Sequence, residues 1–538
     1  MWDALLCLVP TVLLFLTAAL LHWSPVRALL ERVATRVTWI LWKAVYWVLE
    51  LPTPTHGEWT NALRSDLTGL RLVCKPTALA HHLHLHCPTL LHPSVAAWPQ
   101  GDPHLQTLAS LLWPAEGPSG RGKVHFTRDH FLLSDGGIVA LDWAVGLKDE
   151  PVVGARWEQH HGSCRTPGCR NSNLPILLVI PNCLGVVTAH LKQLCFLALH
   201  CGFCPVVFHR RGLGGCPLTT PRYQEFGDPK DLAQAVTYVH RRHPTAGLLA
   251  VSEGSGSGLL LSYLGEYGSS SYLTAAACIS PVLHGQLWFE TPLPSLYHWG
   301  ALYYRKLQIS RYASALRSVM DMGRLLRCRT LRDVEELMFC GSSSKPTTGA
   351  PGEAQSWAEV TKAKAKDWES YWERNEPLRD ADEVAVPVLC LCSADDPLVP
   401  PLSAPLMSLF RHSPYFLLAL TTRGGHCGFA RSGRKVGSGG GGSHGTSTSS
   451  WSHQAVLEYF QVVGDFLKGE ERGRGRRWAS GQDVGGPAQG ARLRSGTLLA
   501  RRRRAVQAVH RKRHQSYQPS QDELPEEDLF TWNRSYTR

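Results

Sequence analysis

One stretch, Leu248 to Gly265 (LLAVSEGSGSGLLLSYLG), constrains the fold of this chain more than any other. An apolar run typical of a buried strand meets a group of glycines and serines, and a helix-compatible run begins at Leu259. Strand, tight turn and helix in this order are typical of a G-x-S-x-G motif, in which a nucleophilic serine sits on a strained turn. The residues in those five places are Ser252, Glu253, Gly254, Ser255 and Gly256. Glycine and serine have exchanged places, so enzymatic activity depends on the residue in the serine's place, Gly254.

Strands and helices alternate on both sides of this stretch. Before it, the patterns predict a strand within Asn171 to Cys183, a helix over His190 to His200, a strand over Pro205 to His209 and a helix over Asp231 to His240. After it, strands are expected over Tyr272 to Pro281, Ala385 to Ser393 and Tyr415 to Thr421. Such units predict an α/β fold with a doubly wound, mostly parallel sheet. An aromatic and charged block at about residues 290–385 predicts a helical lid insertion that shapes a pocket.

These patterns divide the 538 residues into four parts. Residues 1–50 predict a membrane anchor and, from Val37 onward, a Trp-rich interfacial helix, and residues 51–120 form an N-terminal extension. The α/β domain is expected over residues 121–468, with a glycine- and serine-rich loop at 437–450. Residues 469–538 are basic and then acidic, with few apolar residues, and predict a disordered tail.

The N-terminal segment carries a targeting signal. Leu5 to Leu21 is apolar and uncharged, near the lower limit of about 17–25 residues for a membrane span. The basic residues that follow it are Arg27, Arg32, Arg36 and Lys43. Their position predicts a single-pass signal-anchor with a cytosol-facing domain, and we expect the endoplasmic reticulum membrane. A cleaved signal peptide and secretion are the alternative, which Asp3 and the lack of an early Lys or Arg disfavour.

The charge of the chain and its potential metal ligands limit which partners and cofactors we expect. The formal net charge is +12, much of it beyond Glu470, and no nucleic-acid-binding module is visible, so we expect a membrane partner and no nucleic acid. A zinc or redox protein is one alternative function. Its candidate residues are His81, His82, His84, His86, Cys87, Cys201 and Cys204. Alternation with leucines sends the histidines to different faces, and the cysteine pair closes a helix where a redox pair would begin one. We therefore expect no metal and no cofactor.

Several stretches resemble a known family. They are HCPTL (86–90), DGGIVALDW (135–143), TPR (220–222), LLLSYLG (259–265), VPVLCL (386–391), ADDP (394–397) and GGHCGF (424–429). In order over about residues 75–470, they resemble the membrane-anchored α/β-hydrolase domain-containing lipid hydrolases. The resemblance implies an α/β-hydrolase sheet with a helical lid, acting in acyl-lipid metabolism.

The resemblance also implies two members of a charge relay. The family's catalytic acid matches Asp396 in D-x-x-V-P, with Asp395 as the alternative. The family's base in GGH-x-GF matches His426. An Asp–His pair of this kind orients the imidazole and stabilises its protonated form.

Two departures from the family concern the nucleophile and the oxyanion hole. With the register set by LLLSYLG, Gly254 occupies the nucleophile position. A serine there would be held in a backbone conformation that costs about 1–3 kcal/mol, whereas glycine adopts it freely. The oxyanion-hole region contains Asn182, Cys183 and Ser255, and Asn182 replaces a family glycine.

Two functions remain open. One is a catalytically impaired regulator of lipid metabolism that binds an acyl lipid or a regulatory protein at the membrane. The other is an active serine lipase or esterase that uses Ser255 with Asp396 and His426.

Overall fold

A computed structural model of the chain describes residues 33, 36, 37, 40–51, 70–96, 101–112, 124–145, 174–317, 319–341, 364–431 and 450–480. The predicted span Leu5 to Leu21, the loop at 437–449 and the tail beyond residue 480 lie outside these residues. The chain divides into two compact units, one of Met1–Lys75 and Cys87–Phe460 and one of Pro76–His86 and Gln461–Arg538.

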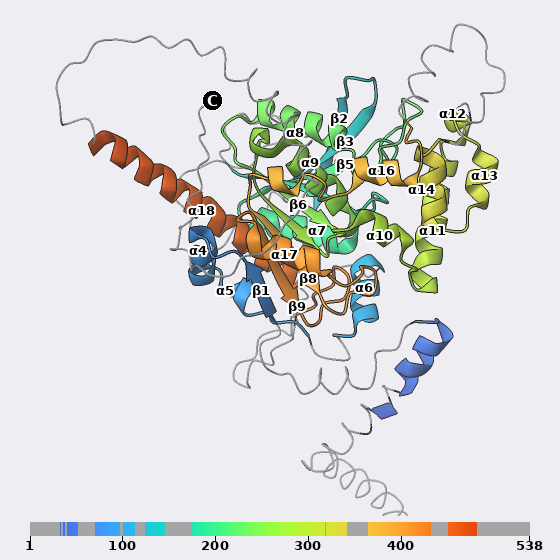
Figure 1. The fold of residues 1–538 in the computed structure, drawn as a ribbon, viewed down its shortest axis with the longest axis horizontal. Helices are drawn as coiled ribbons and strands as arrows, with labels where there is room; N and C mark the ends of the chain where they lie inside the picture. The colour runs from blue at the N-terminus through green and yellow to red at the C-terminus, as the bar shows by residue number, and fades with distance from the viewer. Residues whose placement is uncertain are drawn as a thin grey trace, which may run out of the picture. The chain divides into compact units, whose positions relative to one another are not determined.

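The larger unit contains a sheet, to which the described residues contribute nine strands (Figure 1). In chain order these are β1 (Leu70–Cys74), β2 (His125–Leu132), β3 (Ile138–Val145), β4 (Ile176–Ile180), β5 (Cys204–His209), β6 (Leu248–Glu253), β7 (Leu273–Ile279), β8 (Val388–Ser393) and β9 (Phe416–Thr421). Their order across the sheet is β1-β9-β8-β7-β6-β4-β5-β3-β2. The neighbours from β5 to β9 are parallel, and β1, β2 and β3 add antiparallel pairs at the two sides.

Burial explains this arrangement. Every residue of β4 (ILLVI), β6 and β8 is buried, as expected for parallel strands that are covered on both faces. The edge strand β2 instead alternates between exposed and half-buried residues. Its hairpin with β3 turns at Ser134 to Gly137. The doubly wound, mostly parallel sheet predicted from the sequence is confirmed.

Helices connect the parallel strands and form the lid. The connecting helices are α7 (Ala189–His200), α8 (Lys230–Arg242), α9 (Ser257–Tyr267) and α17 (Ala404–His412). Between β7 and β8 lie α10 (Gly285–Glu290), α11 (Ser295–Ser310), α12 (Ala313–Leu316), α13 (Met322–Arg327), α14 (Leu331–Phe339) and α16 (Trp368–Asn375), which gather at one side of the sheet (Figure 1). Buried Tyr371, Trp372 and Trp368 pack in their own hydrophobic cluster there. The predicted lid insertion is therefore helical.

The structure corrects two predicted boundaries. The α/β domain does not begin at residue 121, because β1 pairs with β9 and α6 (Pro103–Leu112) also belongs to the larger unit. The disordered tail does not begin at residue 469, because α18 (Trp451–Ser480) continues to Ser480. Glu and Arg, which are good helix formers, extend that helix beyond its apolar part. Two further helices are α4 (Ala78–His86) and α5 (Pro88–Leu91).

The turn after β6 allows a test of packing. A Cβ on Gly256 would lie 2.3 Å from the backbone oxygen of Pro181, which cannot move aside cheaply. We expect Gly256→Ala to lower the free energy of unfolding by about 1–3 kcal/mol, measured by urea denaturation. Gly247→Ala is the matched control, since nothing lies within 4 Å of a Cβ there. Equal stability of the two variants would contradict this packing.

Candidate functional site

The turn after β6 presents Gly254 to the imidazole of His426. β6 ends at Glu253, and a single 3-10 turn (Gly254–Gly256) leads into α9. Gly254 has φ +53°, in the left-handed region that side chains disfavour and glycine tolerates. A Cβ on Gly254 would lie 2.8 Å from Nε2 of His426. The place where a nucleophilic side chain would meet the base is therefore occupied by a residue without a side chain.

Asp396 and His426 form a hydrogen-bonded pair at the carboxyl ends of β8 and β9. Nδ1 of His426 lies 2.9 Å from Oδ2 and 3.2 Å from Oδ1 of Asp396. The Oδ1 atom also accepts hydrogen bonds from the backbone amides of Leu398 (2.8 Å) and Val399 (3.2 Å), which fixes the carboxylate. Burial opposes protonation of His426, but the charge and hydrogen bond of Asp396 outweigh it, so the pKa of His426 lies well above its usual value.

Asp395 has a different environment. Its Oδ1 atom accepts hydrogen bonds from the Ser393 hydroxyl and from the amide of Gly425, at 2.9 Å for the latter. Burial raises the pKa of Asp395 to about 6. This carboxyl therefore holds the loop that carries His426, whereas Asp396 contacts the imidazole itself.

Helix α6 holds His426 in place, although α6 lies in the predicted N-terminal extension and thus outside the predicted α/β domain. The amide of His426 donates to the Thr107 hydroxyl (2.9 Å), and the Ser110 hydroxyl donates to the His426 carbonyl (3.2 Å). Thr107 and Ser110 are three residues apart and thus share one helix face. Motif reasoning missed both, because nothing in their spacing distinguishes them from ordinary helix residues.

The loop after β4 contains the predicted oxyanion-hole residues. The amide of Cys183 donates a hydrogen bond of 3.0 Å to the hydroxyl of Ser255. The side chain of Asn182 accepts a long hydrogen bond from the amide of Val186 (3.4 Å). Within the described part of the chain, no hydrogen bond joins Ser255 to His426. Ser255 thus occupies a donor that an oxyanion would need, and it is not paired with the base.

A cavity of about 570 Å³ opens over Gly254 and His426. Its wall is formed largely by apolar side chains of α10, α11 and α14, among them Trp288, Phe289, Leu296, Tyr297 and Val334. The polar groups in its lining include Arg210, Tyr223, Gln224, Arg305 and Glu335, none of which was singled out from the sequence. A largely apolar cavity with a few polar groups fits a ligand that has a long apolar part.

The histidines and cysteines of the zinc or redox alternative do not form a metal site or a redox site in the described part of the chain. The histidines at 81–86 lie on the helix α4. No group of three His, Cys, Asp or Glu side chains is arranged to hold a metal ion in the residues that the structure describes. Cys201 caps the C-terminal end of α7, the end at which the helix dipole does not lower a thiol pKa.

Comparison with known proteins gives the family. No family model matches the chain. Protein ABHD15 of Homo sapiens is 44% identical over 475 residues, which cover 87% of this chain and 86% of that protein. Phospholipase ABHD3 of Mus musculus is 25% identical over 367 residues, covering 67% of this chain and 78% of that protein, and its Homo sapiens counterpart is 24% identical over 368 residues. With this identity and coverage, and with an α/β-hydrolase sheet and lid, the chain belongs to the α/β-hydrolase domain-containing family.

Proposed function

We propose that this protein is a lipid-binding regulator with strongly impaired hydrolase activity. The observation that carries the proposal is Gly254 facing His426, with no side chain that could attack an acyl carbon. In a serine protease, loss of the nucleophile alone lowers kcat by about a million-fold. The base, the acid and the lidded cavity remain, and a relative is a phospholipase, which supports an acyl lipid as the ligand.

The geometry around Ser255 favours this function over an active lipase. A substitute nucleophile must lie within hydrogen-bond reach of the base. Ser255 instead accepts a hydrogen bond from Cys183. Rotation of Ser255 toward His426 would break that hydrogen bond, so the active-lipase function requires its loss.

Membrane anchoring is a further part of the proposal. Among the described residues, no helix is long and apolar enough to cross a membrane. Residues 40–48 are helical, with Tyr46 buried and its hydroxyl donating to Asp102 (2.7 Å). Trp47 on the same helix is 81% exposed, and Leu41 and Val48 are exposed as well. An aromatic and aliphatic surface of this kind suits an interfacial helix beside the predicted span.

Protease protection tests the anchor. In sealed microsomes that contain the full chain, we expect added protease to degrade an epitope tag placed after Arg538, because the basic residues after Leu21 predict a domain on the cytosolic side. Carbonate washing should leave the protein in the membrane fraction. A tag that is protected until detergent is added would contradict this topology.

Fluorophosphonate labelling tests the catalytic part. We expect the wild-type chain to remain unlabelled and Gly254→Ser to become labelled, because the new side chain would point at Nε2 of His426. Labelling of Gly254→Ser should be lost when His426→Ala is added. Labelling of the wild type that disappears in Ser255→Ala would show that the active-lipase function is correct.

The retained ion pair makes a pH-dependent prediction. Because the pKa of His426 is raised in the folded protein, its contribution to stability is present below about pH 6.5, the unfolded value, and is lost as the pH rises through the folded value. In Asp396→Asn, burial would instead keep His426 neutral. We therefore expect the loss of unfolding free energy in Asp396→Asn to be larger at pH 6 than at pH 9, measured by urea denaturation. The imidazole resonance of His426 should titrate at a lower pH in the variant, and an unchanged titration would contradict the pairing.

A further inference from the structure

Arg210 is a buried cation with unused hydrogen-bond donors. It directly follows β5, lines the cavity over Gly254 and is 6% exposed. Its Nη1 atom makes one long hydrogen bond, 3.4 Å to the carbonyl of Glu225. Its Nε and Nη2 atoms have no hydrogen-bond partner among the described residues. A guanidinium in this state costs folding free energy unless another group compensates it.

The neighbouring charges do not supply that compensation. Arg305, on α11, is 8% exposed and stands over the ring of Tyr223. The nearby carboxylate belongs to Glu335. Its Oε2 atom lies 3.7 Å from Nη2 of Arg305, and its Oε1 atom accepts a hydrogen bond of 2.7 Å from the Tyr371 hydroxyl. Burial raises the pKa of Glu335, which weakens the charge that it can offer. The buried carboxyl of Glu335 thus pairs with Arg305, and no hydrogen bond joins it to Arg210 among the described residues.

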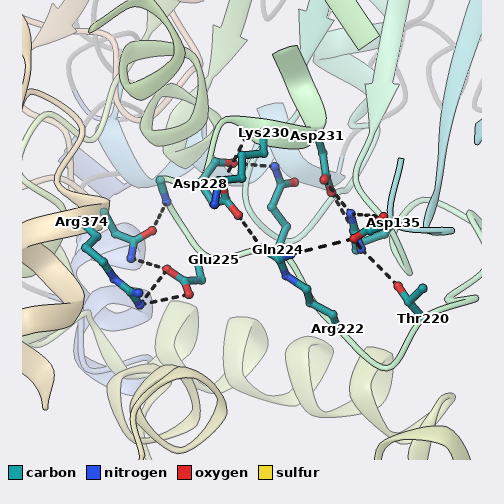
Figure 2. Close-up of polar contacts among 12 residues, drawn as sticks. Asp135, Thr220, Arg222, Gln224, Glu225, Asp228, Lys230, Asp231 and Arg374 are labelled. Carbon is teal, nitrogen blue, oxygen red and sulfur yellow. Dashed lines mark hydrogen bonds and ion pairs between the residues drawn. The ribbon is translucent and has the colours of Figure 1, made fainter. Parts of the chain in front are cut away.

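Arg210 is followed in the chain by an arginine that belongs to a polar network with Asp135, Thr220 and Asp231 (Figure 2). The adjacent Arg211 makes a two-pronged ion pair with Asp231 (2.6 and 2.7 Å) and a second ion pair with Asp135 (2.8 Å). At the far end of the loop, Glu225 accepts from the side chain of Asn375 (2.6 Å). Arg210 is thus held in place by the fold before any ligand binds, as a preorganised binding group requires.

The cavity around Arg210 has two parts. Its polar part includes the Tyr223 hydroxyl, which is buried without a hydrogen-bond partner and, like Arg210, can donate a hydrogen bond to a ligand. Its apolar part includes Trp288, Phe289 and Leu293. A ligand that satisfies both parts has a compact polar end that accepts hydrogen bonds and a long apolar end.

We infer that the cavity binds an acyl lipid whose head group is an oxyanion, either a carboxylate or a phosphate, with its oxygens accepting hydrogen bonds from Arg210. The acyl chain lies along the apolar wall of α10 and α11. This inference rests on the proposed lipid-binding function and adds the charge of the ligand. It also gives a reason for the buried arginine, because a bound oxyanion pairs the donors that the protein leaves open.

Ligand binding to the full chain in phosphatidylcholine nanodiscs tests the inference. The probes are radiolabelled oleate, oleoyl lysophosphatidate and the neutral oleyl alcohol. We expect the wild type to bind one or both anionic probes about 10- to 100-fold more tightly than the alcohol, the range for a hydrogen bond to a charged group. The anionic probe with the higher affinity identifies the head group as carboxylate or phosphate.

Two variants locate the effect. In Arg210→Met, we expect the preference for the anion to fall to within about threefold while oleyl alcohol binds as before. Arg317→Met, at an exposed lid residue, should leave the preference unchanged. Equal binding of all three probes by the wild type would overturn the inference and leave lipid binding intact. Binding of none of them would overturn the proposed function as well, and a preference retained in Arg210→Met would show that another group holds the anion.

Discussion

The hydrogen bond between Asp396 and His426 is the interaction on which the site depends. It joins the loops after β8 and β9 and points the imidazole at the turn after β6. Asp395 and helix α6 hold the same loop from two other directions. The structure thus maintains the geometry of a general base while the residue opposite the base, Gly254, has no group from which it could take a proton.

Two features of the site, the buried Asp396–His426 pair and the buried Arg210, are unfavourable for folding stability when each is considered alone. A buried ion pair contributes little net stability, and a buried unpaired arginine lowers it. Both Asp396–His426 and Arg210 line or approach one cavity beneath the lid. A cavity with no side chain at Gly254 but with positive charge and an apolar wall has the properties of a binding site for an anionic amphiphile. Under the proposed function, the protein uses an enzyme fold to hold a lipid beneath the helices between β7 and β8.

Prediction from the sequence succeeded where one segment contains the whole signal. The runs that became β4 to β9 are apolar and short, and the turns between them carry the residues that matter. Asp396 and His426 could be identified because family motifs surround them, and Gly254 because LLLSYLG sets the register. Thr107, Ser110 and Arg210 could not be identified, because each acts through a contact with a residue that is distant in the chain. The strand β1 was missed for the same reason, since an edge strand is defined by its partner β9.

The sequence by itself determined the α/β architecture, the lid insertion and the exchange of serine for glycine at the turn, because these follow from local periodicity and from residue identity at one position. The sequence favoured Asp396 but left Asp395 open as the partner of His426, and tertiary structure decided between them and decided where Ser255 points. Asp395 and Asp396 are neighbours with the same chemistry, and only the packing of the loops after β8 and β9 separates their roles. The same is true of Ser255, whose hydroxyl faces Cys183 because the loop after β4 packs against the turn after β6.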